Sequence, residues 1–271
     1  MYLTKAKKLL NQEYQQRYKE NVSGFHIELM NEKIRHSYQV LGAGNFILRH
    51  EPCFATLKSQ EIDKLQAMVL LHDIGRFYEV LMAEKKQFID HGVYGAEMLA
   101  QIPEFNKKDI LLPIRHHGHL IEALYVDEEY KALSQKEKKI IERNAFLVRD
   151  ADKLANFYLL ATHFDECGPM FLVAGEHKDP HSKDISEKIR GDFLSHKSII
   201  RSEVRNLAEK ALLLWAWIFD VNYSSSFLFM ERLHLAETLF KFFSCYWKEE
   251  DACLFKDEME KFIESKHKKS S

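Results

Sequence analysis

The spacing of apolar and polar residues predicts a chain built from amphipathic helices. Leu3, Leu9, Leu10 and Tyr14 lie among Lys, Gln and Glu, which indicates a helix over residues 2–20 that covers the core from outside. Further helices are expected over residues 25–48, 59–74, 91–101, 107–117 and 134–162. The pattern is mixed over 77–90, irregular or briefly helical over 120–133, and helical again over 185–266. Large apolar residues within 212–219 and 227–243 are typical of core packing.

Several residue types mark where these helices begin and end. Ser59 and Asn106 are candidate N-caps, and Ser134 and Glu137 have the spacing of a capping box. Gly75 follows an apolar helical stretch, so we expect it to end that helix with a positive φ angle.

Composition supports an all-α fold. The 271 residues include only 10 Gly and 5 Pro, which favours helices joined by short loops. The formal net charge of -2 provides no overall field to attract nucleic-acid polymers or an anionic membrane. The N-terminus lacks the apolar core of a signal peptide, and no run approaches the roughly 18 apolar residues of a membrane span. The four cysteines form no CxxC pair, so we expect reduced thiols in a cytoplasmic protein.

The predicted elements suggest one domain over residues 1–271. We expect a core over about 25–165 and a helical extension over about 185–268 packed on it. Residues 165–184 gather Gly, Pro, His and Asp and are interpreted as a long loop. The simplest role for this loop is a connector, and the alternative is a lid over a site.

Side chains that bind metals recur on the predicted helices or at their ends. His72 and Asp73 follow the apolar run Val69–Leu71, and a cation beside a helix end could bind both, since adjacent helical residues point about 100° apart. Alone, such a pair is more typical of a solvated surface. His36 lies within one expected helix, and His116 and His117 end another. Asp150 and Asp152 lie among apolar residues, where a buried carboxylate needs a partner or a metal.

This pattern resembles the HD superfamily of metal-dependent phosphohydrolases, which are all-helical. The resemblance rests on HSYQVL around His36, LLHDIGR around His72 and DADKL around Asp152. The runs DHGVYGAEML and IRHHGH resemble the two-metal branches, including HD-GYP phosphodiesterases. The GYP segment is missing, because Ile121, Glu122 and Ala123 follow the histidines, which argues against a cyclic dinucleotide substrate. HDIGRF and IFDVNYSSSF also resemble a group of uncharacterised bacterial HD proteins.

The resemblance implies a fold of an HD-domain helical bundle and a set of ligands for two metals. The first cation would bind His36, His72, Asp73 and Asp152, and the second His91, His116 and His117, with Asp73 bridging. Asp150 would orient a ligand. Imidazole-rich sites of this kind suit Fe, Mn, Co, Ni or Zn better than Mg. Arg76 and Arg115 could neutralise charge on a phosphate.

The implied function is hydrolysis of a small phosphoester, such as a nucleotide or related metabolite, by a water that two metals activate. Two alternatives share the same residues. One is a mixed-valence di-iron oxygenase, because the ligand order His, His-Asp, His, His, Asp is also satisfied. The other is a metal-containing nucleotide-binding module without turnover. Specificity would come from residues 77–90, 118–133 and 165–184, and the sequence leaves the oligomeric state open.

Overall fold

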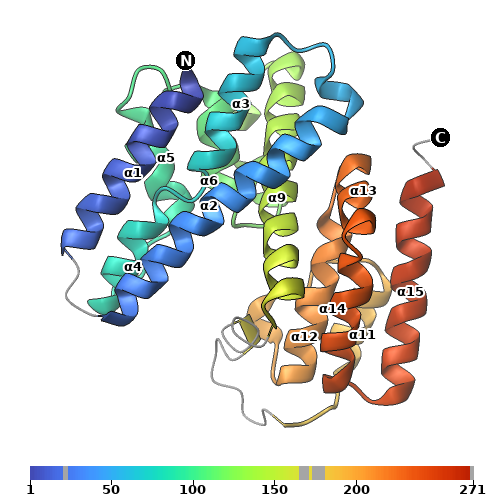
Figure 1. Ribbon diagram of the computed structural model, residues 1–271. Helices are drawn as coiled ribbons and strands as arrows, with labels where there is room; N and C mark the ends of the chain where they lie inside the picture. Colours follow the sequence, from blue (N-terminus) through green and yellow to red (C-terminus); the bar gives the residue numbers. More distant parts are fainter. Residues whose placement is uncertain (21–23, 165–170, 173–180, 269–271) are drawn as a thin grey trace. The chain divides into compact units, whose positions relative to one another are not determined.

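The computed structural model describes residues 1–20, 24–164, 171–172 and 181–268, and every regular element within them is helical (Figure 1). The expected all-α class is therefore confirmed. The backbone divides into two compact units, residues 1–155 and 156–271. The expectation of one domain over the whole chain stays a prediction. Most of the expected loop over 165–184 lies outside the described residues.

The first unit is organised around one buried helix, α3 (Ser59–Leu71). Leu65, Met68 and the run Val69–Leu71 are almost completely shielded from solvent, as the apolar spacing predicts. Helices α1 and α2 pack against α3, α2 also packs against α4, and α5 packs against α6. The other elements of this unit are α1 (Tyr2–Glu20), α2 (Gly24–His50), η1 (Pro52–Phe54), α4 (Arg76–Glu84), α5 (His91–Ala100), α6 (Lys108–His116), α7 (Glu122–Val126), α8 (Glu128–Lys131) and α9 (Gln135–Thr162).

Of the three N-cap residues expected from the sequence, one caps its helix and two do not. The Ser134 capping box is present, since Glu137 Oε2 accepts from the Ser134 backbone N–H at 2.9 Å and Ser134 Oγ accepts from the Glu137 N–H at 3.4 Å. The expectations for Ser59 and Asn106 were wrong, because Lys58 and Lys107 occupy the two N-cap positions. At α3, Glu61 accepts from the Lys58 N–H instead, so the acidic residue of the first turn satisfies the helix start.

The end of α3 also differs from the expectation. The helix stops at Leu71, and residues 72–75 form a turn that leads into α4, a helix in a region where the pattern was mixed. Gly75 has φ -72° and ψ -14°, so the prediction of a positive φ was wrong. Space requires the glycine instead: a Cβ atom there would lie 2.2 Å from the backbone oxygen of His91. The turn and the start of α5 therefore meet backbone to backbone.

The second unit has an aromatic core. Phe193 lies with its ring centroid 4.9 Å from those of Phe219 and Phe255, and Trp247 lies 5.3 Å from Phe255. Within 212–219 and 227–243, Trp215, Phe227 and Phe243 are almost completely buried, which confirms the core packing expected there. The elements are α11 (Glu187–Leu194), η2 (Arg201–Glu203), α12 (Leu207–Ala216), η3 (Trp217–Asp220), α13 (Ser224–Arg232), α14 (Leu235–Phe243), η4 (Ser244–Tyr246) and α15 (Glu249–Lys268).

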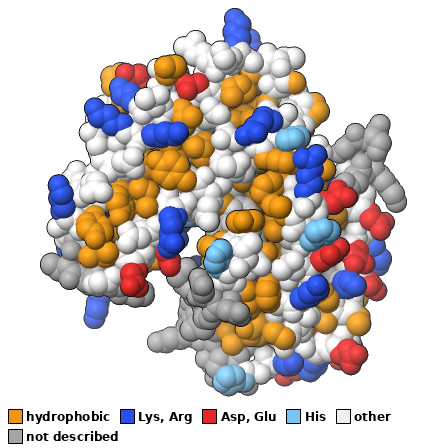
Figure 2. Space-filling model, viewed as in Figure 1, with side chains coloured by type: hydrophobic (Ala, Val, Ile, Leu, Met, Phe, Trp, Pro, Cys, Tyr) orange, Lys and Arg blue, Asp and Glu red, His pale blue; other side chains and the backbone are white. Residues whose placement is uncertain are grey.

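The distribution of charged side chains on the surface can be compared with the partners expected from the composition. On the face drawn in Figure 2, Lys and Arg side chains are scattered among hydrophobic and acidic ones rather than gathered into one large patch. None of the described helices is long and apolar enough to cross a membrane. Cys53, Cys245 and Cys253 are exposed and form no disulfide within the described part of the chain, and Cys167 lies outside the described residues.

Replacing Gly75 by alanine tests the backbone contact at the turn. We expect Gly75→Ala to lower the free energy of unfolding by about 1–3 kcal/mol or more, because the new methyl group meets a backbone oxygen that cannot rotate away. Gly42→Ala is the matched control: Gly42 is exposed within α2 and a Cβ there meets no atom within 4 Å. That control should gain up to about 1 kcal/mol. Equal effects of the two substitutions in chemical denaturation would contradict the contact.

Candidate metal centre

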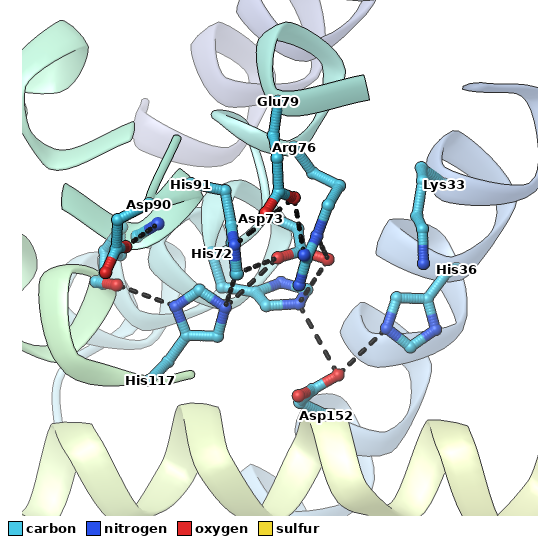
Figure 3. Close-up of polar contacts among 12 residues, drawn as sticks. Lys33, His36, His72, Asp73, Arg76, Glu79, Asp90, His91, His117 and Asp152 are labelled. Carbon is cyan, nitrogen blue, oxygen red and sulfur yellow. Dashed lines mark hydrogen bonds and ion pairs between the residues drawn. The ribbon is translucent and has the colours of Figure 1, made fainter. Parts of the chain in front are cut away.

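The first group of possible metal ligands joins the end of α3 to two other helices. His36 from the middle of α2 lies beside His72 and Asp73 in the turn after α3, and one donor atom of each lies within 4.8 Å of the others. Asp152 from α9 is attached to the same group: its Oδ1 lies 2.9 Å from His36 Nε2 and 3.7 Å from His72 Nε2. His36 and Asp152, two residues far apart in sequence, thus converge on the His-Asp pair (Figure 3).

The second group shares Asp73 with the first. Asp73 Oδ1 lies 3.3 Å from Nε2 of His91 and 3.1 Å from Nε2 of His117, and the two nitrogen atoms are 3.2 Å apart. Two ligands bound at right angles to one cation at about 2.1 Å are about 3 Å apart. Asp73 Oδ2, meanwhile, lies 3.7 Å from His72 Nε2 in the first group. The carboxylate therefore presents one oxygen to each group.

The imidazole rings are oriented with Nε2 toward the centre. Nδ1 of His72 lies 2.9 Å from the Val69 carbonyl oxygen, and Nδ1 of His117 lies 2.7 Å from that of Ile114. A carbonyl only accepts, so each Nδ1 carries the proton and each Nε2 keeps its lone pair. His72 Nε2 is buried and makes no hydrogen bond. A buried lone pair of this kind, facing two carboxylates, is what a divalent cation would satisfy, and the residues present fit one.

The carboxylates at the centre are strongly acidic. Burial alone would raise the pKa of Asp73, but Arg76 and the neighbouring histidines outweigh it and hold that pKa well below its ordinary value. Burial also opposes ionisation of Asp152, but the hydrogen bond from His36 and the nearby imidazole of His72 outweigh it, again to a pKa well below the ordinary value. Both carboxylates are therefore ionised at neutral pH, as metal ligands must be.

Two of the three histidines that face Asp73, His72 and His117, differ in their affinity for a proton. Burial, together with the nearby His72 and His91, lowers the pKa of His117, so its ring is neutral and available as a ligand. Burial also disfavours protonated His72, but Asp73 and Asp152 outweigh it and raise the pKa. The same two carboxylates that draw a proton to His72 would draw a metal cation in its place.

The structure brings six of the seven expected ligands together and places His116 elsewhere. Nε2 of His116 lies 2.9 Å from Asp127 Oδ2. His116 and His117 are adjacent at the end of α6, so their side chains point in different directions, and His117 is the one that faces Asp73. Arg115 makes ion pairs with Asp127 at 3.2 Å and Glu129 at 2.8 Å. The roles expected for His116 and Arg115 stay predictions.

Arg76, the other expected catalytic residue, lies at the centre. Its Nε atom is 3.5 Å from Asp73 Oδ2, and its Nη1 atom is 2.6 Å from Glu79 Oε2. Glu79 also lies 3.5 Å from Nδ1 of His91, on the side of that ring opposite Asp73. Sequence reasoning missed Glu79. Its only signal is the spacing of one helical turn from Arg76 within α4, a helix that the mixed pattern concealed.

Sequence reasoning also missed Arg149, which fixes the segment that carries His117. Arg149 is buried on α9, one turn before Asp152, and donates to the carbonyl oxygens of His117, at 3.2 Å, and of His119. One helix therefore supplies a carboxylate to the first group and holds the backbone of the second. Asp90 does the equivalent for His91: it caps α5 by accepting from the Gly92 and Val93 N–H groups, each at 3.0 Å.

Comparison with known proteins agrees with this geometry. Residues 34–156 match the family model described as the HD domain, and that range includes every residue of both groups. The match covers somewhat less than half of the chain. No curated protein and no solved structure matched the chain.

Separate substitutions of the two adjacent histidines test which one binds metal. The sequence predicts that the double variant His116→Ala/His117→Ala keeps its fold and loses about one metal per chain. The geometry predicts further that His117→Ala alone produces that loss, because of these two histidines only His117 directs Nε2 toward Asp73. His116→Ala should keep its full metal complement when measured by elemental analysis after metal loading. Loss of metal from His116→Ala, or none from His117→Ala, would contradict this assignment.

Proposed function

Because this chain carries an HD domain, a family that binds divalent metals and commonly comprises metal-dependent hydrolases, we propose that it hydrolyses a small phosphate ester. The substrate would be a nucleotide or a related metabolite. The observation that carries the proposal is the position of Asp73, whose two carboxylate oxygens face two separate groups of imidazole donors. This arrangement supports two divalent cations of the Fe, Mn, Co, Ni or Zn type on either side of one bridging carboxylate.

The protein's own side chains have distinct parts in this proposal. His36, His72 and Asp152 would hold one cation, and His91 and His117 the other, with Asp73 between them. Divalent cations held there would polarise the phosphoryl oxygens and lower the pKa of a nearby water.

The guanidinium of Arg76 lies beside Asp73, with Nε 3.5 Å from Oδ2, and in this proposal it contacts the phosphate. Glu79 accepts from Arg76 Nη1, which fixes the guanidinium, and the other edge of the guanidinium faces Asp73. A fixed cation beside the reacting group stabilises negative charge that develops on phosphoryl oxygens. Glu79 also lies beside Nδ1 of His91, where it would hold that ring with Nε2 toward the centre.

A panel of phosphate esters tests the proposal. Purified protein loaded in turn with Mn, Co, Ni, Zn and Fe should release phosphate or cleave a diester from at least one small substrate. His72→Ala and Asp73→Ala should lose that activity, because each removes a residue of the first group. Release no faster than from these variants, with every metal, would refute hydrolysis. Oxygen uptake by the iron-loaded protein would then favour the oxygenase, and nucleotide binding without product the module without turnover.

The two arginines expected at the phosphate allow a matched comparison. Arg76→Gln should lower kcat by about 10²–10³, the usual cost of removing one group that stabilises transition-state charge. Arg115→Gln should lower kcat much less, because its guanidinium is engaged by Asp127 and Glu129. A similar loss in both variants would place Arg115 at the substrate as well, as its position before His116 suggested. No loss in Arg76→Gln would remove Arg76 from the reaction.

A further inference from the structure

Besides Arg76, a second positively charged side chain, that of Lys33, lies near the first group of ligands. Lys33 is on α2, three residues before His36, so both side chains leave the same face of the helix. Figure 3 shows its amino group beside the His36 ring, with Arg76 across from it. Its charge interacts with that of Arg76 and with the carboxylates of Asp73 and Asp152. Among the residues that the structure describes, its ammonium has no hydrogen bond and no ion pair within 4.0 Å.

Arg76 is likewise only partly satisfied. Nη1 donates to Glu79, but Nε is buried and has no hydrogen-bond partner, since Asp73 Oδ2 lies 3.5 Å away. A buried guanidinium N–H without an acceptor is costly. Among the described residues, Lys33 of α2 and Arg76 of α4 therefore each present an N–H donor without an acceptor near the first group.

The electrostatic cost of this pair indicates that an anion belongs there. Burial and the repulsion from Arg76 lower the pKa of Lys33, so holding these two cations near each other is unfavourable in the absence of a ligand. The carboxylates of Asp73, Asp152 and Glu32 offset part of this repulsion at Lys33, and Glu79 does so at Arg76. With two divalent cations bound, those four negative charges are balanced by the metals, and Lys33 and Arg76 leave the centre with a net positive charge.

We propose that Lys33 and Arg76 together bind the non-bridging oxygens of a phosphoryl dianion, so that the substrate is a phosphate monoester rather than a diester. A monoester carries two negative charges and three free oxygen atoms, enough to occupy the metals and both cationic side chains. A diester carries one charge and has only two free oxygens. The inference rests on the proposed function, and Lys33 becomes a residue that selects the substrate by its charge.

Binding of simple anions tests this without any need for turnover. The probes are inorganic phosphate at pH 8, where it is a dianion, and dimethyl phosphate, a monoanion, each titrated calorimetrically into metal-loaded protein. Lys33→Gln should weaken phosphate binding at least tenfold, since a charge-assisted hydrogen bond of this kind is lost. Dimethyl phosphate binding should change much less. Lys33→Arg should restore most of the phosphate affinity.

Arg35→Gln is the matched control, because Arg35 lies two residues further along α2 and its side chain is exposed. It removes the same charge and should leave phosphate affinity within about twofold, as expected for a solvated charge. Unchanged phosphate binding in Lys33→Gln would overturn the inference, and so would loss of metal from that variant, which would make Lys33 a structural residue. Lys33-dependent phosphate binding without hydrolysis of any ester would refute the proposed function but keep the anion site. Hydrolysis of diesters alone, at a rate that Lys33→Gln does not change, would keep the proposed function but refute the anion site.

Discussion

The structure depends on one buried carboxylate. Asp73 is only 4% exposed, yet it is ionised, so the surrounding fold must supply compensating positive charge or hydrogen-bond donors. Arg76 supplies a permanent cation, and His91 and His117 direct Nε2 toward one of its oxygens. A buried carboxylate with partners on several sides fixes the elements that carry them. The end of α3, the start of α4, the start of α5 and the end of α6 meet at Asp73 for this reason.

Close backbone contacts make that meeting possible. Gly75 brings the turn after α3 against the His91 carbonyl, and a Cβ on Gly92 would lie 2.7 Å from the Arg115 carbonyl oxygen. Two helix ends and one helix start thus approach more closely than side chains would permit. Arg149 then holds the carbonyls of the segment that follows α6 from the side of α9. The metal centre is therefore positioned mainly by main-chain contacts and by helix termini.

The helices could be predicted because they follow short-range spacing, as the Ser134 capping box illustrates, and most candidate ligands because motifs such as the LLHDIGR run resemble those of the HD superfamily. The sequence could not choose between His116 and His117, because that choice depends on how the last turn of α6 faces Asp73. Nor could it find Arg149 or Lys33, whose partners lie more than ten residues away in sequence, or Glu79, which lies beside His91 twelve residues further along. Gly75 shows the same limit, because glycine is needed there for a close contact with the start of α5 and not for a local turn conformation.

The central claim is that Asp73 lies between two cations, and electron paramagnetic resonance of the Mn-loaded protein tests it most directly. At two equivalents of Mn²⁺, the account predicts the spectrum of a spin-coupled pair, because the shared carboxylate would bridge the ions. In Asp73→Asn the coupled signal should disappear. Signals of isolated Mn²⁺ alone at two equivalents, or saturation at one ion per chain, would contradict the account.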